Sequence, residues 1–149
     1  MTLPTVDTDL RKIWLIEVSV DVNANAGEEF SYTVDTYGDM VSGQTASDPE
    51  FKAPNSGKYF VVFKLKTSGA IFNSTPVNWT EPTATDPDAE KPTNSDVHLY
   101  LGDASKVLII EDHNQGSTEK NYHFELRVDL GGTTYVSPDP IIMNEPDVD

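Results

Sequence analysis

The chain has 149 residues, in which 25 Asp and Glu oppose 10 Lys and Arg for a formal net charge of −15, and it contains no cysteine. A chain of this length is expected to fold as one domain around a single core. The charge disfavours nucleic acid and anionic membranes as partners, and without cysteine there is no disulfide, no thiolate zinc site and no thiol nucleophile.

Alternation of apolar and polar residues dominates the chain and predicts strands rather than helices. In chain order, the predicted strands are KIWLIEVSVDV, EFSYTV, EFKAP, KYFVVFKLKT, AIFNS, PVNWT, VHLYL, KVLII and NYHFELRVDL. The three longest have clear inward faces, formed by Trp14, Ile16, Val18 and Val20, by Tyr59, Val61, Phe63 and Leu65, and by Tyr122, Phe124, Leu126, Val128 and Leu130. Turn-forming residues separate these segments. We therefore predict an all-β fold, an antiparallel β-sandwich that is immunoglobulin-like in broad architecture.

Three connections can be assigned from composition. Gly131-Gly132 predicts a two-residue hairpin turn, because both central positions of such a turn need a positive φ. Residues 101–106, LGDASK, predict a slightly longer hairpin. Residues 80–96 contain three prolines and small polar residues, so we expect a flexible, acidic surface loop there, with flexible tails at 1–10 and 145–149. Residues 1–149 would then form one domain.

The last predicted strand, TTYVSPDPIIMN, carries Pro138 and Pro140 in its middle. Each proline removes a backbone donor from the ladder, so prolines are confined to edges, strand starts and bulges. We expect a C-terminal edge strand that is broken in two and crosses from one sheet to the other. Such a break would also limit edge-to-edge aggregation.

The C-terminal segment YHFELRVDLGGTTYVSPDPIIMNEP resembles the closing segment of the DP-EP family of small bacterial proteins, through Asp139-Pro140 and Glu145-Pro146. A fainter similarity, in size and in the VNWT run, is to bacterial inclusion-body proteins of the AidA and PixA type. The DP-EP resemblance implies a short β-sandwich without an assigned reaction, and it supplies no catalytic residue to transfer.

One acidic segment, DVNANAGEE, mimics the alternating oxygen ligands of a calcium loop with Asp21, Asn23, Asn25 and Glu28. Its glycine comes one residue late, and the twelfth loop position is Tyr32 rather than a bidentate Glu. A second segment, TDPDAE in the 80–96 loop, lacks the glycine. We expect ordinary connections at both places and assign no metal site.

The three histidines, His98, His113 and His123, show none of the short spacings of transition-metal sites. Glu111, Asp112 and His113 are consecutive, but neighbouring residues of a strand point to opposite faces. We therefore predict histidines that face solvent or lie in turns, and no metal or cofactor.

The sequence contains no G-x-S-x-G elbow and no phosphate-binding glycine loop. Trp79, Tyr37, Tyr100 and Tyr135 would stack on sugar rings if they were exposed together, but alternation places Trp79 inward beside Val77. We therefore predict a protein that is not an enzyme, with no catalytic and no cofactor-binding residues.

Several strands carry apolar residues on both faces. Ile13 and Leu15 lie opposite the inward face of the first strand, and Phe60 and Val62 opposite that of the fourth. The second face needs a cover, either the terminal segments and the Pro-rich loop or another chain. We predict a protein-interaction or self-assembly module that forms a homodimer or binds a protein partner; the alternative is a calcium- or carbohydrate-binding module. A cytoplasmic location is expected, since no leader-like or membrane-spanning run occurs.

Overall fold

The computed structural model describes residues 10–26, 28–37, 44–46, 49–80, 91–93, 95–137 and 140–147. These residues form eleven strands and no helix. The strands are β1 Leu10–Val20, β2 Phe30–Tyr37, β3 Gln44–Ala46, β4 Glu50–Ala53, β5 Gly57–Leu65, β6 Ile71–Trp79, β7 Val97–Gly102, β8 Val107–Asn114, β9 Lys120–Leu130, β10 Thr133–Ser137 and β11 Ile141–Asn144. Within these ranges, no helix is long and apolar enough to cross a membrane.

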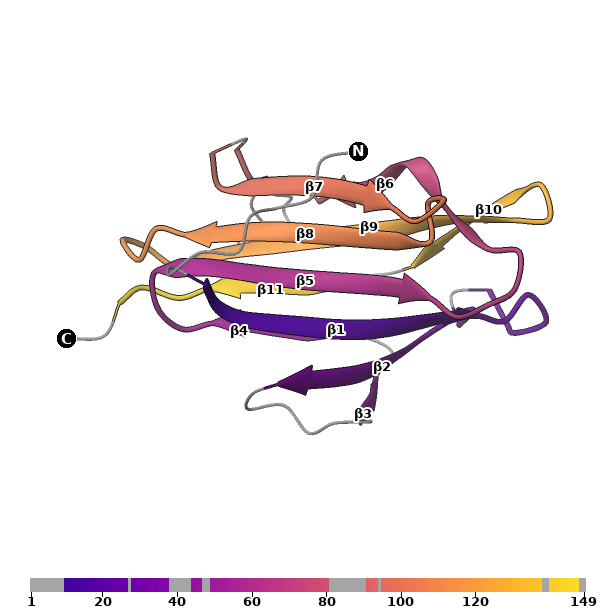
Figure 1. Cartoon of the computed structure of the whole chain (residues 1–149), viewed down its shortest axis with the longest axis horizontal. Coiled ribbons are helices and arrows are strands. Elements are labelled where there is room, and N and C mark those ends of the chain that lie inside the picture. Colours follow the sequence, from indigo (N-terminus) through magenta and orange to yellow (C-terminus); the bar gives the residue numbers. More distant parts are fainter. Residues whose placement is uncertain are drawn as a thin grey trace.

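The strands form two sheets that lie one over the other (Figure 1). The larger sheet has the order β3-β2-β1-β5-β8-β7. In the smaller sheet β9 is central, because β6 pairs with it along one side while β10 and β11 follow one another along the other side. Strand β4 extends this sheet beyond β11. The predicted all-β sandwich is confirmed.

Both sheets are mixed, because two strand pairs are parallel. Strand β1 pairs with β5 and β4 pairs with β11 in parallel, whereas the other pairs within the described residues are antiparallel. Side chains alternate with the same period in both kinds of pair, so the sequence pattern could not reveal this difference from the predicted antiparallel sheets.

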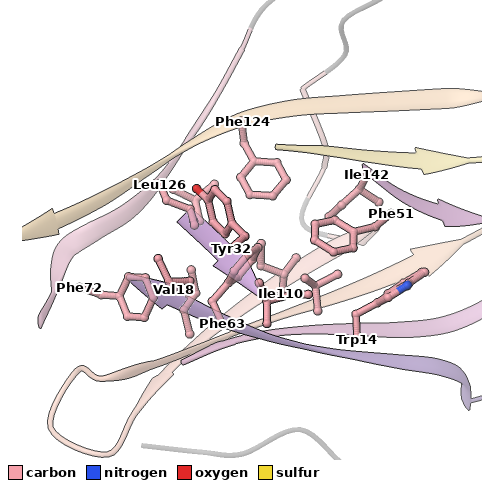
Figure 2. Packing of buried hydrophobic residues seen from close by; sticks show 14 of the residues in the cluster. Trp14, Val18, Tyr32, Phe51, Phe63, Phe72, Ile110, Phe124, Leu126 and Ile142 are labelled. Atoms are coloured by element: carbon pink, nitrogen blue, oxygen red, sulfur yellow. The ribbon is translucent and has the colours of Figure 1, made fainter. Parts of the chain in front are cut away.

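The core contains the three inward faces that alternation predicted. The predicted residues of β1 and β5 and four of the five predicted residues of β9 are buried, and Leu130 packs against them. Aromatic rings connect the two sheets: Phe63 of β5 contacts Phe51 of β4 and Phe124 of β9, with ring centroids 6.0 and 6.2 Å apart. Figure 2 shows these rings between the two layers of ribbon. Pairs of this kind contribute about 0.5–1.5 kcal/mol each beyond their buried area.

The C-terminal strand is broken, as predicted, but it does not change sheets. Strand β10 ends opposite Leu126 and β11 begins opposite His123, so the C-terminal strand contains one residue more than β9 over this interval. Just before β11, the carbonyl of Pro140 accepts a hydrogen bond from the amide of Phe124 at 3.0 Å. Strand β10 lies at an edge, whereas β11 is covered by β4. The expected crossing between sheets is therefore wrong.

Two further elements differ from the sequence analysis. The segments AIFNS and PVNWT form one strand, β6, with a shift in register between Phe72 and Val77. Inside this irregular stretch, Asn73 donates to the carboxylate of Asp129 at 3.1 and 3.2 Å. The three-residue strand β3 was not predicted, since its length gives no alternation to detect.

Described residues at the end of the expected 80–96 loop and in the expected C-terminal tail form backbone hydrogen bonds. Asp96, at the end of the expected 80–96 loop, is buried and forms a turn by donating from its amide to the carbonyl of Thr93. At the other end of the chain, the Glu145 amide donates to Ala53 and the Asp147 amide to Gly116. The chain is thus hydrogen-bonded to the sandwich as far as Asp147.

Both predicted hairpin turns are confirmed. Gly131 and Gly132 have φ values of 60° and 81° between β9 and β10, which suits a two-residue hairpin turn. The LGDASK segment connects β7 to β8 through Asp103, Ala104 and Ser105, whose φ values of 47°, 55° and 63° are also positive. Left-handed backbone costs about 1–2 kcal/mol for residues with a Cβ atom, so the second turn is locally strained.

We expect Ala104→Gly to stabilise the protein, by about 0.5–1 kcal/mol, because glycine adopts a positive φ without the Cβ clash. The thermal melting midpoint should rise by about 1–4 °C for a chain of this size. Ala24→Gly is the matched control, since Ala24 lies in the β1–β2 loop and is not among the positive-φ residues. A fall in the Ala104→Gly midpoint similar to that of the control would contradict this prediction.

Candidate functional site

The DVNANAGEE segment forms the connection between β1 and β2. The Oδ1 atom of Asp21 accepts a hydrogen bond from the amide of Asn23 at 2.9 Å, and the side chain of Asn25 donates to Glu28 at 3.4 Å. These hydrogen bonds stabilise the turn itself. The other acidic candidate, TDPDAE, lies outside the described residues.

The aromatic residues considered for sugar stacking do not share one surface. Trp79 is half-buried and contacts two rings of β9, with centroids 6.1 and 5.2 Å away. Tyr135 also packs against the core, whereas Tyr100 points to the outer face of the larger sheet and donates to Glu111. The side chain of Tyr37 lies outside the described part of the chain. Trp79 is thus a core-edge residue, as alternation indicated.

The outer face of the six-stranded sheet carries the second apolar surface. Register places Ile13 beside Phe60, and Leu15 beside Val62, which in turn neighbours Ile109. We call these five residues the outer patch. Phe60 is only 3% exposed although it lies outside the core cluster, and the other four side chains are half-buried. Contiguous apolar side chains on an outer face are typical of an interaction surface.

Charged side chains of both signs border the outer patch. Lys66 pairs with Glu17 at 2.8 Å, and Lys58 lies 3.6 Å from Glu111. Lys64 is the register partner of Glu17 and has the same outward orientation. Among these five side chains positive and negative charges nearly cancel, in contrast to the net charge of −15 on the whole chain.

Glu111 is the centre of a polar cluster between the outer patch and the β7 edge. Its side chain is almost fully buried, with Lys58 near Oε1 and the hydroxyl of Tyr100 donating to Oε2 at 3.2 Å. Burial, and then the neighbouring Glu111 carboxylate, raise the pKa of the Tyr100 phenol above its usual value. Two partners from different strands therefore orient one buried carboxylate.

Two of the three histidines complete this cluster. His113 follows Glu111 by two residues on β8 and so shares its face, and His98 is the register partner of Glu111 on β7. One ligand atom from each of His98, Glu111 and His113 lies within 4.8 Å of the others. We call these three residues the His-Glu-His cluster. Imidazole and carboxylate groups at such distances have the chemistry of metal ligands.

The nitrogen Nε2 of His113 has no hydrogen-bond partner and is shielded from solvent. It lies 3.4 Å from Oε2 of Glu111, but without the geometry of a hydrogen bond. The two imidazole rings are 5.7 Å apart and almost perpendicular, at 79°. A shielded polar atom without a partner is destabilising, so this nitrogen is suited to a ligand.

The sequence analysis expected isolated histidines and missed this cluster. The consecutive residues Glu111, Asp112 and His113 alternate in direction, as predicted, but Glu111 and His113 are two apart and therefore share one face. The third member is contributed by the β7–β8 hairpin, whose turn was correctly predicted from LGDASK. In the structure Gly102 pairs with Val107, so the turn is two residues shorter than the predicted segment, and this register places His98 opposite Glu111.

Between the two cluster residues of β8, Asp112 points into the core and is fully buried. Its Oδ1 accepts a hydrogen bond from the side-chain nitrogen of Asn144 at 2.8 Å, while its Oδ2 and the Oδ1 of Asn144 have no partner. Burial raises the pKa of Asp112 to about 7, with a smaller contribution from Asp96, and the Asn144 hydrogen bond opposes this rise. This carboxyl group belongs to the interior and not to the outer face.

Comparison with known proteins identifies the family. The sequence model of the DP-EP family matches residues 15–146, which is most of the chain. No curated protein matches the chain. The two dipeptides that suggested the resemblance border β11, since Pro140 precedes this strand and Glu145-Pro146 follows it. The chain belongs to the DP-EP family.

Proposed function

We propose that the protein is not an enzyme but a self-association module, in which the outer patch of one copy binds the outer patch of a second copy. The observation that carries this proposal is the position of the patch. Leu15, Val62 and Ile109 are half-buried on three adjacent strands in the middle of a sheet face. Removing such a surface from water is favourable, and a second copy would complete its burial.

The charges that border the outer patch are compatible with self-association. A net charge of −15 makes two copies repel each other in most orientations. At the border of the outer patch, Lys58, Lys64 and Lys66 offset the carboxylates of Glu17 and Glu111. Two copies can therefore approach through these residues with less repulsion than the net charge of the chain would give.

The same border is self-complementary. In a two-fold symmetric dimer each surface meets an identical surface, so every charge must find its complement within the patch of the other copy. Glu17 and Glu111 meet this condition, because each of these carboxylates already lies beside a lysine. Ion pairs within one copy can thus be exchanged for pairs between copies.

Sedimentation equilibrium tests this proposal with a matched pair of variants. Val62→Glu places a charge in the centre of the outer patch, and we expect it to weaken the dimer at least about tenfold. Val136→Glu is the control, because Val136 is 39% exposed on β10 of the other sheet and receives the same change. The control should associate like the parent.

The salt dependence of dimerisation is a second test, and the proposal predicts whether salt strengthens or weakens the dimer. Raising the salt concentration from about 20 mM to about 300 mM shortens the Debye length from about 20 Å to about 6 Å. The repulsion between two acidic copies is then screened while the apolar contact remains, so the dimer should become tighter. A parent protein that stays monomeric at both concentrations would overturn the proposal.

The alternative, a calcium-binding module, predicts a different result. It requires a calcium-induced rise in melting temperature that magnesium at the same ionic strength does not reproduce. Asp21, Asn23 and Glu28 would be the residues to mutate in that case. Asp21 and Glu28 each accept a hydrogen bond within this loop, so calcium would have to compete with these bonds.

A further inference from the structure

We propose that the His-Glu-His cluster binds one divalent transition-metal ion, such as Zn²⁺ or Ni²⁺, through His98, Glu111 and His113. This inference goes beyond self-association, because its residues lie towards the β7 edge of the outer face and its chemistry is coordination rather than apolar contact. A single chain supplies all three ligands.

The backbone positions of the three ligands are set by strand pairing. His98 and Glu111 are directly opposite each other on β7 and β8, where Cβ atoms are about 4.5–5.5 Å apart. His113 is two residues from Glu111 on the same strand and the same face. Tetrahedral zinc with bonds of about 2.0–2.1 Å requires ligand atoms about 3.3 Å apart. Small side-chain rotations from the present separations, all within 4.8 Å, would reach that spacing.

The surroundings of the His113 side chain support the binding of a metal ion. Its Nε2 is shielded from water and makes no hydrogen bond, although Oε2 of Glu111 is only 3.4 Å away. A shielded nitrogen lone pair without a partner is unfavourable, and a metal ion between this nitrogen and the carboxylate would satisfy both. The unpartnered nitrogen and the carboxylate oxygen are therefore close enough to share one metal ion.

The types of ligand select the class of metal. Calcium and magnesium prefer oxygen ligands, whereas two imidazoles and one carboxylate suit zinc, nickel and copper. The outer side of the site is open, because His98 is exposed. Water would complete the coordination there.

Lys58 is the natural competitor of the metal. Its ammonium lies 3.6 Å from Oε1 of Glu111, and the two side chains are 11% and 7% exposed. Without a metal, this lysine neutralises the buried carboxylate. With a metal on Oε2, the two positive charges would share Glu111 and repel each other. Lys58→Met should therefore bind the metal more tightly, because the carboxylate then depends on the ion for its charge balance.

Titration calorimetry of the full-length chain with ZnCl₂ and with NiCl₂ tests the site. We expect one ion per chain, and affinity at least about tenfold weaker in His98→Gln and in His113→Gln. The control is His123→Gln, which removes the remaining histidine from β9, on the other sheet, and should change the affinity by less than about twofold. Lys58→Met should bind at least about tenfold more tightly, and zinc should raise its melting temperature more than that of the parent.

NMR of the parent protein tests the metal site without any mutation, so the test does not depend on the folding of a variant. Imidazole NMR signals of His98 and His113 in the parent should shift on addition of zinc, while those of His123 should not. No binding of either metal below about 1 mM would overturn the inference, as would equal losses in His98→Gln and His123→Gln.

Val62→Glu separates this inference from the proposed self-association. If that variant is monomeric and still binds one zinc ion, the site belongs to the single chain, as proposed. If it folds but no longer binds zinc, the metal requires the dimer and the present inference is wrong. A monomeric parent that binds zinc would contradict self-association and leave the metal site supported.

Discussion

Asp112→Asn is expected to stabilise the protein above pH 8 and to leave its stability almost unchanged at pH 4. The pKa of the buried Asp112 is raised from 3.8 to about 7, so the folded protein holds this carboxyl group in its neutral form only below about pH 7. Stability from this group is complete below about pH 4, declines as the pH rises towards 7 and is lost above it. Asparagine is neutral at every pH and avoids the charge.

The geometry around Asp112 explains why the amide should fit. Asn144 already donates to Oδ1 of Asp112, and the two remaining oxygens, Oδ2 of Asp112 and Oδ1 of Asn144, have no partner. An amide at position 112 can keep the first hydrogen bond and donate a second one to Asn144. Two amides would then form a mutual pair in which both orphaned atoms are satisfied.

The expected difference is large for one substitution. About three pH units between the folded and unfolded pKa values correspond to about 4 kcal/mol of unfolding free energy, and relaxation of the site will reduce this to about 2–4 kcal/mol. Denaturant unfolding of parent and variant from pH 4 to pH 9 measures it. Two other groups face Asp112, Asp96 and the phenol of Tyr59, and both remain in the variant, so the difference between the proteins isolates Asp112. Equal stabilities at pH 9 would refute the prediction.

Asn114→Ala is expected to destabilise the protein by about 2–4 kcal/mol, because Asn114 connects the two sheets through buried hydrogen bonds. Its side-chain nitrogen lies 2.9, 3.0 and 2.8 Å from the carbonyl oxygens of Ala53, Asn55 and Glu145. Its side-chain oxygen accepts from the amide of Gly116 at 2.9 Å. One residue of β8 thus holds the end of β4, the β4–β5 loop and the segment after β11.

A comparison of two substitutions at position 114 separates the effect of lost hydrogen bonds from the effect of lost packing. Asn114→Asp keeps the shape but brings carboxylate oxygens against three carbonyls, so it should destabilise more than alanine does at neutral pH. Asn78→Ala is the control, because Asn78 also makes a side-chain hydrogen bond, to Glu125 at 3.0 Å, but is exposed. Its effect should stay within about 0.5 kcal/mol. Urea unfolding at pH 7 would contradict the prediction if all three variants unfolded with the parent.

Much of the candidate site follows from strand pairing that sequence can only partly predict. The apolar residues on the second face, such as Leu15 and Val62, were predicted from alternation and do lie on the outer face. Their adjacency was not predictable, because β1 and β5 are parallel neighbours separated by three intervening strands. The proximity of Lys58 and Glu111 was not predictable either, because it depends on the pairing of β5 with β8.

Most of the strands, the core-facing side chains of the three longest strands and the two hairpin turns could be predicted from local sequence. These properties depend on local alternation and on the positive φ that positions such as Gly131 and Gly132 require, and both are written in consecutive residues. The position of β11 beside β9 and the contact of His98 with Glu111 and His113 could be recognised only in the folded chain. Such contacts depend on how strands that are distant in sequence pair and pack. The alternation of residues along one strand does not reveal which strands lie beside it.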